Sequence, residues 1–253
     1  MILRRLTDAF RKQDWFTVFI ETLIVVLGVF LGIQLGNWNE ARLERAQSAA
    51  FTRALENDLR AEALLYRNAV SYYGSVMESG ERALAALEGD VELADEDLVI
   101  NAYRASQVAQ APANRSTFDE LVSTGRINLI TDKELRAMAT SHFGLNWVEV
   151  SAADGRQSDY RQLFRSLIPP EAHRAARAHC GDVERKEVVA LDYACTLDLP
   201  PAAIAHAANA LRSDPALPDA LRRRINELDV QITDLQREAA QLEQMSLRQE
   251  QRQ

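Results

Sequence analysis

Few side chains in this sequence are spaced for metal or catalytic chemistry. His173, His179, Cys180 and Asp182 lie close together and are the residue types that bind zinc. Zinc sites, however, are built from closely spaced pairs such as C-x₂-C or H-x₃-H. Here the spacing is H-x₅-H-C and no second pair follows. We therefore predict no metal ligand and no cofactor.

The other histidine and aromatic side chains considered for a site are predicted to have structural roles. His142 follows Met138 by four positions on an apolar helical face, which predicts a hydrogen-bonded histidine in or near the core. Phe143 and Trp147 share a face by the same spacing and are predicted to pack in a core rather than to line a ligand groove. No nucleophile elbow, P-loop or metalloprotease motif occurs. The sequence therefore predicts a protein without catalytic residues.

The chain has two cysteines, Cys180 and Cys195, and both lie between the proline pairs 169–170 and 200–201. In an oxidising compartment a disulfide between them would close this irregular segment and contribute about 3 kcal/mol in a loop-entropy account. Two unrelated buried thiols are the alternative. We predict the disulfide.

Glu21 opens an apolar segment that contains glycines at every fourth position. At about 100° per residue, the glutamate shares one narrow helical face with the glycines and one valine. The predicted helix–helix interface consists of Glu21, Val25, Gly28, Gly32 and Gly36. Glycines let a second helix approach closely, and a carboxylate within a membrane is costly unless a partner faces it. The alternative is a single anchor whose glutamate reaches the lipid headgroups.

The segment that carries this face is long enough to cross a membrane. From Phe16 to Gly36, Glu21 is the one ionisable residue. A helix over this segment measures about 31 Å, close to the thickness of a bilayer core. Trp15 and Trp38 flank it, as expected at the two membrane interfaces. A buried soluble helix and a cleaved signal peptide are the alternatives; we predict a transmembrane helix over residues 15–38.

Basic residues set the predicted orientation. Arg4, Arg5, Arg11 and Lys12 crowd the short segment before Trp15, whereas two of the four arginines in residues 39–60 lie more than ten residues from the membrane. Since Lys and Arg near a span favour the cytoplasmic side, residues 1–14 are predicted to be a cytoplasmic tail. Residues 39–253 would then lie in the periplasm of a Gram-negative bacterium, with the span in the inner membrane.

The exported part is acidic. The chain carries −8; taking away the segment 1–14, which carries +2, and Glu21, which carries −1, leaves −9. Such a charge disfavours nucleic acid as a partner.

Two heptad patterns mark the ends of the exported part. Leu59, Ala63, Tyr66, Val70, Tyr73, Met77, Gly80, Leu84 and Leu87 form the first pattern. Leu221, Ile225, Leu228, Ile232, Leu235, Ala239 and Leu242 form the second. They predict an antiparallel coiled-coil stalk of residues 39–88 with 217–250, and a head of residues 89–216. Either pattern could instead pair with another copy of the chain.

The middle of the chain predicts short helices. Ser116 and Gly125 are placed to start and end one helix, and Thr131 with Glu134 forms a capping box for the next. Only "KEVVALDY" suggests a strand. The predicted fold class is all-α: an N-terminal transmembrane helix followed by an extended helical bundle.

Two blocks of the sequence, "ETLIVVLGVFLGIQLGNWNEAR" and "TFDELVSTGRINLITDKELRAMATSHF", resemble a family of uncharacterised bacterial single-span membrane proteins. The first block follows the pattern E-x-x-x-V-V-x-G…Q-x-x-x-W-N-E. The resemblance covers about a fifth of the chain, and it implies a membrane-anchored helical protein without bringing an activity.

Two classes of function fit these features. The first is a membrane-anchored structural or protein-interaction protein, which forms a homo-oligomer or an accessory subunit of a larger membrane complex. Its partners are membrane lipid and, at the glycine face, either a second copy of the chain or another membrane protein. The second is a periplasmic sensor or ligand-binding module that signals through the membrane helices of a partner.

Overall fold

The computed structural model describes residues 15–109, 113–185, 188–191 and 193–250. The basic tail 1–14, on which the predicted orientation rests, lies outside the described residues. The described chain is mostly helical, which confirms the all-α class.

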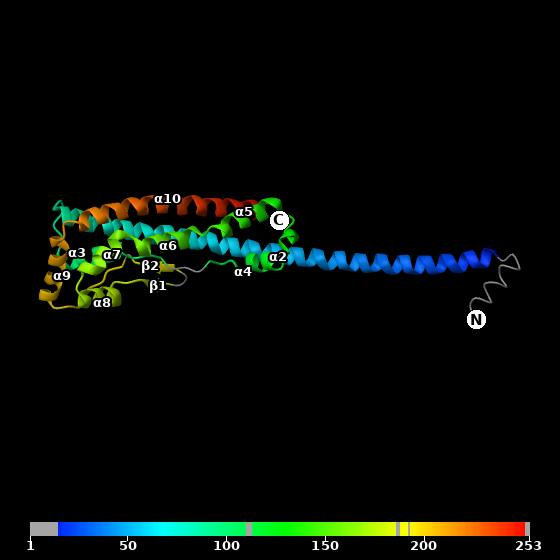
Figure 1. The fold of residues 1–253 in the computed structure, drawn as a ribbon, viewed down its shortest axis with the longest axis horizontal. Coiled ribbons are helices and arrows are strands. Elements are labelled where there is room, and N and C mark those ends of the chain that lie inside the picture. Colours follow the sequence, from blue (N-terminus) through cyan, green and yellow to red (C-terminus); the bar gives the residue numbers. More distant parts are fainter. Residues whose placement is uncertain (1–14, 110–112, 186–187, 192, 251–253) are drawn as a thin grey trace.

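One helix, α2 (Trp15–Glu88), determines the overall shape. Its first part projects as a single rod, and its last part lies inside a bundle (Figure 1). Each residue of 21–40 is exposed, whereas buried residues recur from Leu55 to Ala83. By length and hydropathy this apolar N-terminal helix could cross a membrane, and none of its apolar window is buried. The bundle therefore leaves the whole apolar segment uncovered.

The last helix, α10 (Leu217–Glu250), runs antiparallel to the second half of α2. Arg222 of α10 pairs with Glu88 at the end of α2, while Arg67 and Glu243 pair at 3.1 Å farther back along both helices. Between them the backbones approach closely at Gly80, where an added Cβ would lie 3.2 Å from Ile225 Cγ1. The antiparallel contact is thus observed; knobs-into-holes packing along it stays a prediction.

The buried face of α2 is wider than a heptad pattern requires. Leu55, Tyr72, Val76 and Ala83 lie outside the predicted heptad positions and are fully or almost fully buried. These extra positions are covered because shorter helices also pack on α2, beside α10. A two-stranded coiled coil would leave that side in solvent.

The shorter elements pack along the two long helices. They are α3 (Asp95–Ala105), α4 (Ser116–Ser123), the 3₁₀ turn η1 (Ile127–Leu129), α5 (Lys133–Gly144), α6 (Trp147–Gln157), α7 (Asp159–Leu167), α8 (Pro170–His179) and α9 (Pro201–Ser213). One core joins α2 and α10 to α4 and α5, and a second joins them to α3, α7, α8 and α9. Residues 89–216 thus share both cores with the long helices, so the predicted stalk and head are not separate packing units.

Helix ends in this region follow only partly from the predicted capping residues, with two corrections. Ser116, predicted to cap α4, lies inside that helix; the N-cap position is Arg115, and no side chain caps it. Gly125 adopts φ +68°, the left-handed turn predicted after α4. Helix α5, by contrast, is capped by Asp132, whose carboxylate accepts hydrogen bonds from the backbone N–H groups of Glu134 and Leu135. The predicted Thr131 cap is therefore wrong by one position. Both side chains suit a cap, and the sequence does not choose between them.

The two proline pairs bracket the only strands among the described residues, β1 (Val183–Arg185) and β2 (Val188–Ala190), which pair antiparallel. Cys180 and Cys195 are joined by a disulfide across this hairpin, with Cα atoms 5.4 Å apart. Arg104 of α3 holds the same loop: its guanidinium donates to the Tyr193 carbonyl at 2.6 Å and lies 5.2 Å from the centre of the Tyr193 ring. The disulfide therefore fastens the hairpin segment to the core of α3 and α8.

We expect Leu228→Asp to lower the free energy of unfolding by about 4 kcal/mol, because it removes a fully buried leucine and leaves a carboxylate without a partner. The neighbouring Asp229→Asn, on the exposed side of α10, should change it by less than about 0.5 kcal/mol. Thermal unfolding of the detergent-solubilised protein measures both. Equal shifts would contradict the observed α2–α10 contact.

Cys180→Ser should free one thiol at Cys195 and cost about 3 kcal/mol, the typical value for a loop of this size. The test is alkylation of the protein, purified from cells and denatured without reductant, followed by mass spectrometry. The unmodified protein should show no alkylated cysteine. Two alkylated cysteines would disprove the bond in the cell.

Candidate functional site

The predicted interface residues lie together on the projecting part of α2. Glu21, Val25, Gly28, Gly32 and Gly36 are all exposed. A Cβ atom added at any of the three glycines would meet no other atom within 4 Å. Within the described part of the chain, no element packs against this face. Among residues 15–109, 113–185, 188–191 and 193–250, the face is therefore open and Glu21 is exposed.

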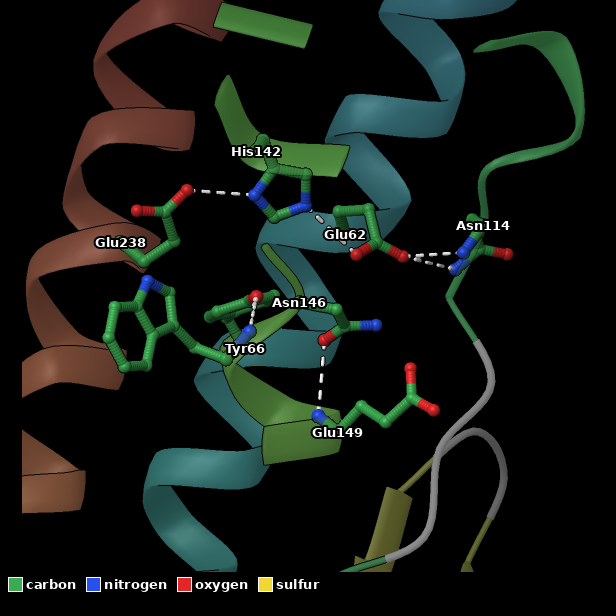
Figure 2. A network of polar contacts seen from close by, with 8 residues as sticks. Glu62, Tyr66, Asn114, His142, Asn146, Glu149 and Glu238 are labelled. Atoms are coloured by element: carbon green, nitrogen blue, oxygen red, sulfur yellow. Dashed lines mark hydrogen bonds and ion pairs between the residues drawn. The ribbon is translucent and has the colours of Figure 1, made fainter. Parts of the chain in front are cut away.

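A second group of polar side chains is buried inside the bundle, at the junction of α2, α5 and α10. His142 lies between two carboxylates (Figure 2). Its Nδ1 is 2.8 Å from Glu238 Oε1 of α10, and its Nε2 is 3.0 Å from Glu62 Oε2 of α2. The Glu62 side chain is 0% exposed and that of Glu238 18%. We call Glu62, His142 and Glu238 the buried triad.

The loop before α4 completes the hydrogen bonding of Glu62. Its second oxygen, Oε1, accepts the Asn114 backbone N–H at 2.6 Å and the Asn114 side-chain amide at 3.3 Å. Both oxygens of this buried carboxylate are therefore satisfied, as a buried charge requires. Three helices and one loop thus meet at the buried triad.

Local structure explains how His142 reaches this position. It lies near the C-terminal end of α5, which stops at Gly144. Asn146 then starts α6 by accepting the Glu149 backbone N–H at 3.2 Å, and the Tyr66 hydroxyl of α2 accepts the Trp147 backbone N–H at 3.1 Å. The turn between α5 and α6 separates Phe143 from Trp147, which therefore do not share one helical face as predicted.

The two carboxylates determine the protonation of His142. Burial disfavours the charged imidazolium, but the hydrogen bonds that Glu238 and Glu62 accept from it, together with their negative charges, outweigh burial and raise the pKa of His142 above its usual 6.5. A neutral imidazole has one N–H and would leave one carboxylate facing a nitrogen lone pair. The structure therefore favours a doubly protonated His142 that donates to both glutamates.

The buried triad joins three helices through the side chain of His142. Both ring nitrogens of His142 are engaged, so neither is available to bind a metal or to accept a proton from a substrate. Among the described residues no group of three or more His, Cys, Asp and Glu side chains could hold a metal ion. In the cluster that resembles a metal site, Cys180 is in the disulfide and Asp182 accepts the Tyr72 hydroxyl at 2.8 Å.

Sequence reasoning found His142 as a hydrogen-bonded core residue and missed its partners. Glu62 and Glu238 each directly precede a heptad position, Ala63 and Ala239, so they border the two predicted seams. A charge bordering an apolar seam ordinarily faces solvent. In the sequence, the triad is visible only as two glutamates that border the seams and a histidine on an apolar helical face. These residues can be paired only once it is known that α5 lies beside both long helices.

Comparison with protein-family models, with curated proteins and with solved structures gives no significant match for this chain. The resemblance of the two sequence blocks to a bacterial membrane-protein family therefore stays a prediction.

The pH at which His142 loses its proton tests the hydrogen bonds of the buried triad. We expect the imidazole of His142, followed by NMR, to lose its proton at a midpoint above pH 6.5. Glu238→Gln should lower this midpoint by removing one charged acceptor, while Glu243→Gln, which pairs elsewhere with Arg67, should not. A midpoint below 6.5 in the unmodified protein would contradict the doubly bonded imidazolium.

The sign of the stability effect follows from the same shift. Because the pKa of His142 is higher in the folded than in the unfolded chain, its contribution to the free energy of unfolding is complete below about pH 6.5. It is lost as the pH rises through the raised folded value.

Proposed function

We propose that this protein is a membrane-anchored interaction protein: the first part of α2 spans a membrane, and the glycine face of that span packs against another transmembrane helix. The partner helix belongs to a second copy of the chain or to another membrane protein. The observation that carries the proposal is the open face of Glu21, Gly28, Gly32 and Gly36 on a helix segment that the bundle leaves uncovered.

The exposure of the apolar segment supports a membrane as its surroundings. Large apolar side chains from Phe16 to Leu35 are exposed on every side of the helix. An apolar surface of this size in water would be an aggregation site, whereas lipid covers it without cost. A core helix of a soluble protein has its apolar face buried by its own chain, and none of this segment's apolar window is buried.

The arrangement of the face supports a partner helix in addition to lipid. The glutamate and the three glycines fall within about 80° of arc, because i, i+4 spacing keeps residues on one side of a helix. Small residues allow close van der Waals packing of backbones, which lipid tails do not match. Glu21 lies about 7.5 Å along the helix from Phe16, so its carboxyl group is inside the apolar segment. A hydrogen-bonding partner there removes most of its cost.

The basic residues of the tail, together with the disulfide, support an orientation with the N-terminus in the cytoplasm and the bundle in the periplasm. Arg4, Arg5, Arg11 and Lys12 all precede the span within a short stretch of chain. The bond between Cys180 and Cys195 fits the oxidising compartment on the other side.

A periplasmic sensor or ligand-binding module is the second candidate. The observation in its favour is the continuity of α2, which runs unbroken from the apolar segment into the bundle. A change of packing in the bundle would move the span itself. In this second candidate the signal would pass through the membrane helices of a partner.

Gly32→Leu tests the interface. A leucine on the glycine face would hold the partner helix away and should weaken the assembly at least about tenfold, while insertion stays intact because leucine is more apolar. Val26→Leu, about 140° around the helix from Glu21, is the matched control and should have little effect. Light scattering and mass spectrometry of the detergent-solubilised protein give the size and composition of the assembly. If Gly32→Leu changes neither, the glycine face is not an interface.

A further inference from the structure

The hydrogen bond between His142 and Glu238 joins α5 to α10 (Figure 2). These two helices share little close backbone contact, whereas α2 and α10 run side by side (Figure 1). Three leucines of α10 that are at most 2% exposed also lie in one hydrophobic core with residues of α2: Leu228, Leu235 and Leu242. The contact of α5 with α10 therefore depends on this hydrogen bond more than the contact of α2 with α10 does.

The buried triad holds more carboxylates than one histidine can neutralise. Glu62 and Glu238 approach opposite nitrogens of the His142 ring, at 3.0 and 2.8 Å. With both nitrogens protonated, each carboxylate accepts a hydrogen bond, and two carboxylates with one imidazolium leave a single negative charge. After the loss of one proton there are two negative charges, and one carboxylate faces a nitrogen lone pair. The geometry therefore couples the packing of the triad to the protonation of His142.

The surroundings of the two carboxylates determine which hydrogen bond the neutral ring keeps. The Glu62 side chain is 0% exposed, and its other oxygen already accepts from Asn114. If its bond to the ring were lost, water could not replace it, and a buried charge without a donor is costly. The Glu238 side chain is 18% exposed, so water can reach it. The neutral ring therefore keeps Nε2–H for Glu62, and its Nδ1 lone pair repels Glu238.

The other groups around the ring do not cancel this change. From α2, the Tyr66 ring lies 5.2 Å from that of His142, and burial raises the pKa of Tyr66 far above its usual 10, so the phenol stays neutral. At the start of α6, the uncharged Trp147 bonds to Tyr66 through its backbone N–H. Farther along α10, Glu243 is paired at the surface with Arg67 of α2, at 3.1 Å.

The chain after His142 can accommodate a movement of the end of α5. The helix stops at Gly144, two residues later, and Asn146 caps the start of α6. Leu145, between the two helices, is 47% exposed. The end of α5 can therefore shift without removing a buried apolar side chain of this turn from the core.

We propose that the hydrogen bond between His142 and Glu238 is a pH-sensitive latch between α5 and α10. The latch is closed while His142 is doubly protonated. When the ring loses its Nδ1 proton, the bond to Glu238 breaks and the end of α5 separates from α10, while Nε2–H still donates to Glu62 of α2. Because the pKa of His142 is raised above 6.5, the latch opens as the pH rises above that value.

Spin labels measure the opening. The two native cysteines are joined in the disulfide, so introduced cysteines can be labelled selectively. We place one label on α5 with Ser141→Cys and one on α10 with Gln241→Cys, both at exposed positions of the full-length, detergent-solubilised protein. Dilution with unlabelled protein limits the measured distances to those within one chain. From about pH 6 to about pH 10, the distance should lengthen by at least about 3 Å, as an intervening layer of water requires.

A second label pair and two variants make the result specific. Labels at Ser71→Cys of α2 and Thr233→Cys of α10, both exposed, should keep their distance, since the latch does not join these helices. Glu238→Gln should keep the α5–α10 distance constant over the pH range, because an amide can bond a neutral ring as donor or acceptor. Glu243→Gln, which removes a carboxylate outside the triad, should respond like the unmodified protein.

NMR of the His142 ring on the same protein records the loss of the proton. The proposal is overturned if the α5–α10 distance stays constant while the ring loses its proton, or if the α2–α10 distance changes with it. It is also overturned if the ring keeps its proton up to the pH at which the bundle unfolds. These outcomes are independent of the glycine face, whose test is the size and composition of the assembly.

Discussion

The antiparallel contact between α10 and the second half of α2 is the constraint on which every other element depends. The contact brings together residues from opposite ends of the chain, as the pairs Arg222–Glu88 and Arg67–Glu243 show. The shorter helices all lie in the segment 89–216, which connects the end of α2 to the start of α10. Because these two helix ends are adjacent, the segment must leave the helix pair and return to the same end of it. The shorter helices do so by packing along the pair, so that both hydrophobic cores contain residues of α2.

The buried triad fixes the register of this arrangement. Apolar seams alone tolerate a shift of one helix along the other by a heptad, because each apolar side chain then meets another apolar side chain. A histidine bonded to Glu62 on one helix and Glu238 on the other permits a single alignment. Any shift would leave a buried carboxylate without its partner, which typically costs about 3–5 kcal/mol. The same bonds position α5 and the Asn114 loop.

The sequence predicted the elements whose signal is local or periodic. The heptad positions, the left-handed Gly125 and the choice of Cys180 with Cys195 could all be read from spacing and residue type. Features that depend on how distant helices pack together could not be predicted from the sequence. Periodicity shows that α2 has an apolar face but not that Leu55 and Val76 are covered from a second side. The partners of His142 come from helices 80 and 96 positions away in sequence.

The continuity of α2 sets the distance between the apolar segment and the bundle. Trp38 ends the apolar segment, and the first part of the bundle to bond α2 is η1, where the Ser48 hydroxyl donates to the Leu129 carbonyl at 2.6 Å. The unbroken helix between these points rises about 15 Å. With the span in a bilayer, the bundle therefore stands clear of the lipid surface on a stiff spacer. A partner that contacts both the glycine face and the bundle would have to extend over this distance along α2.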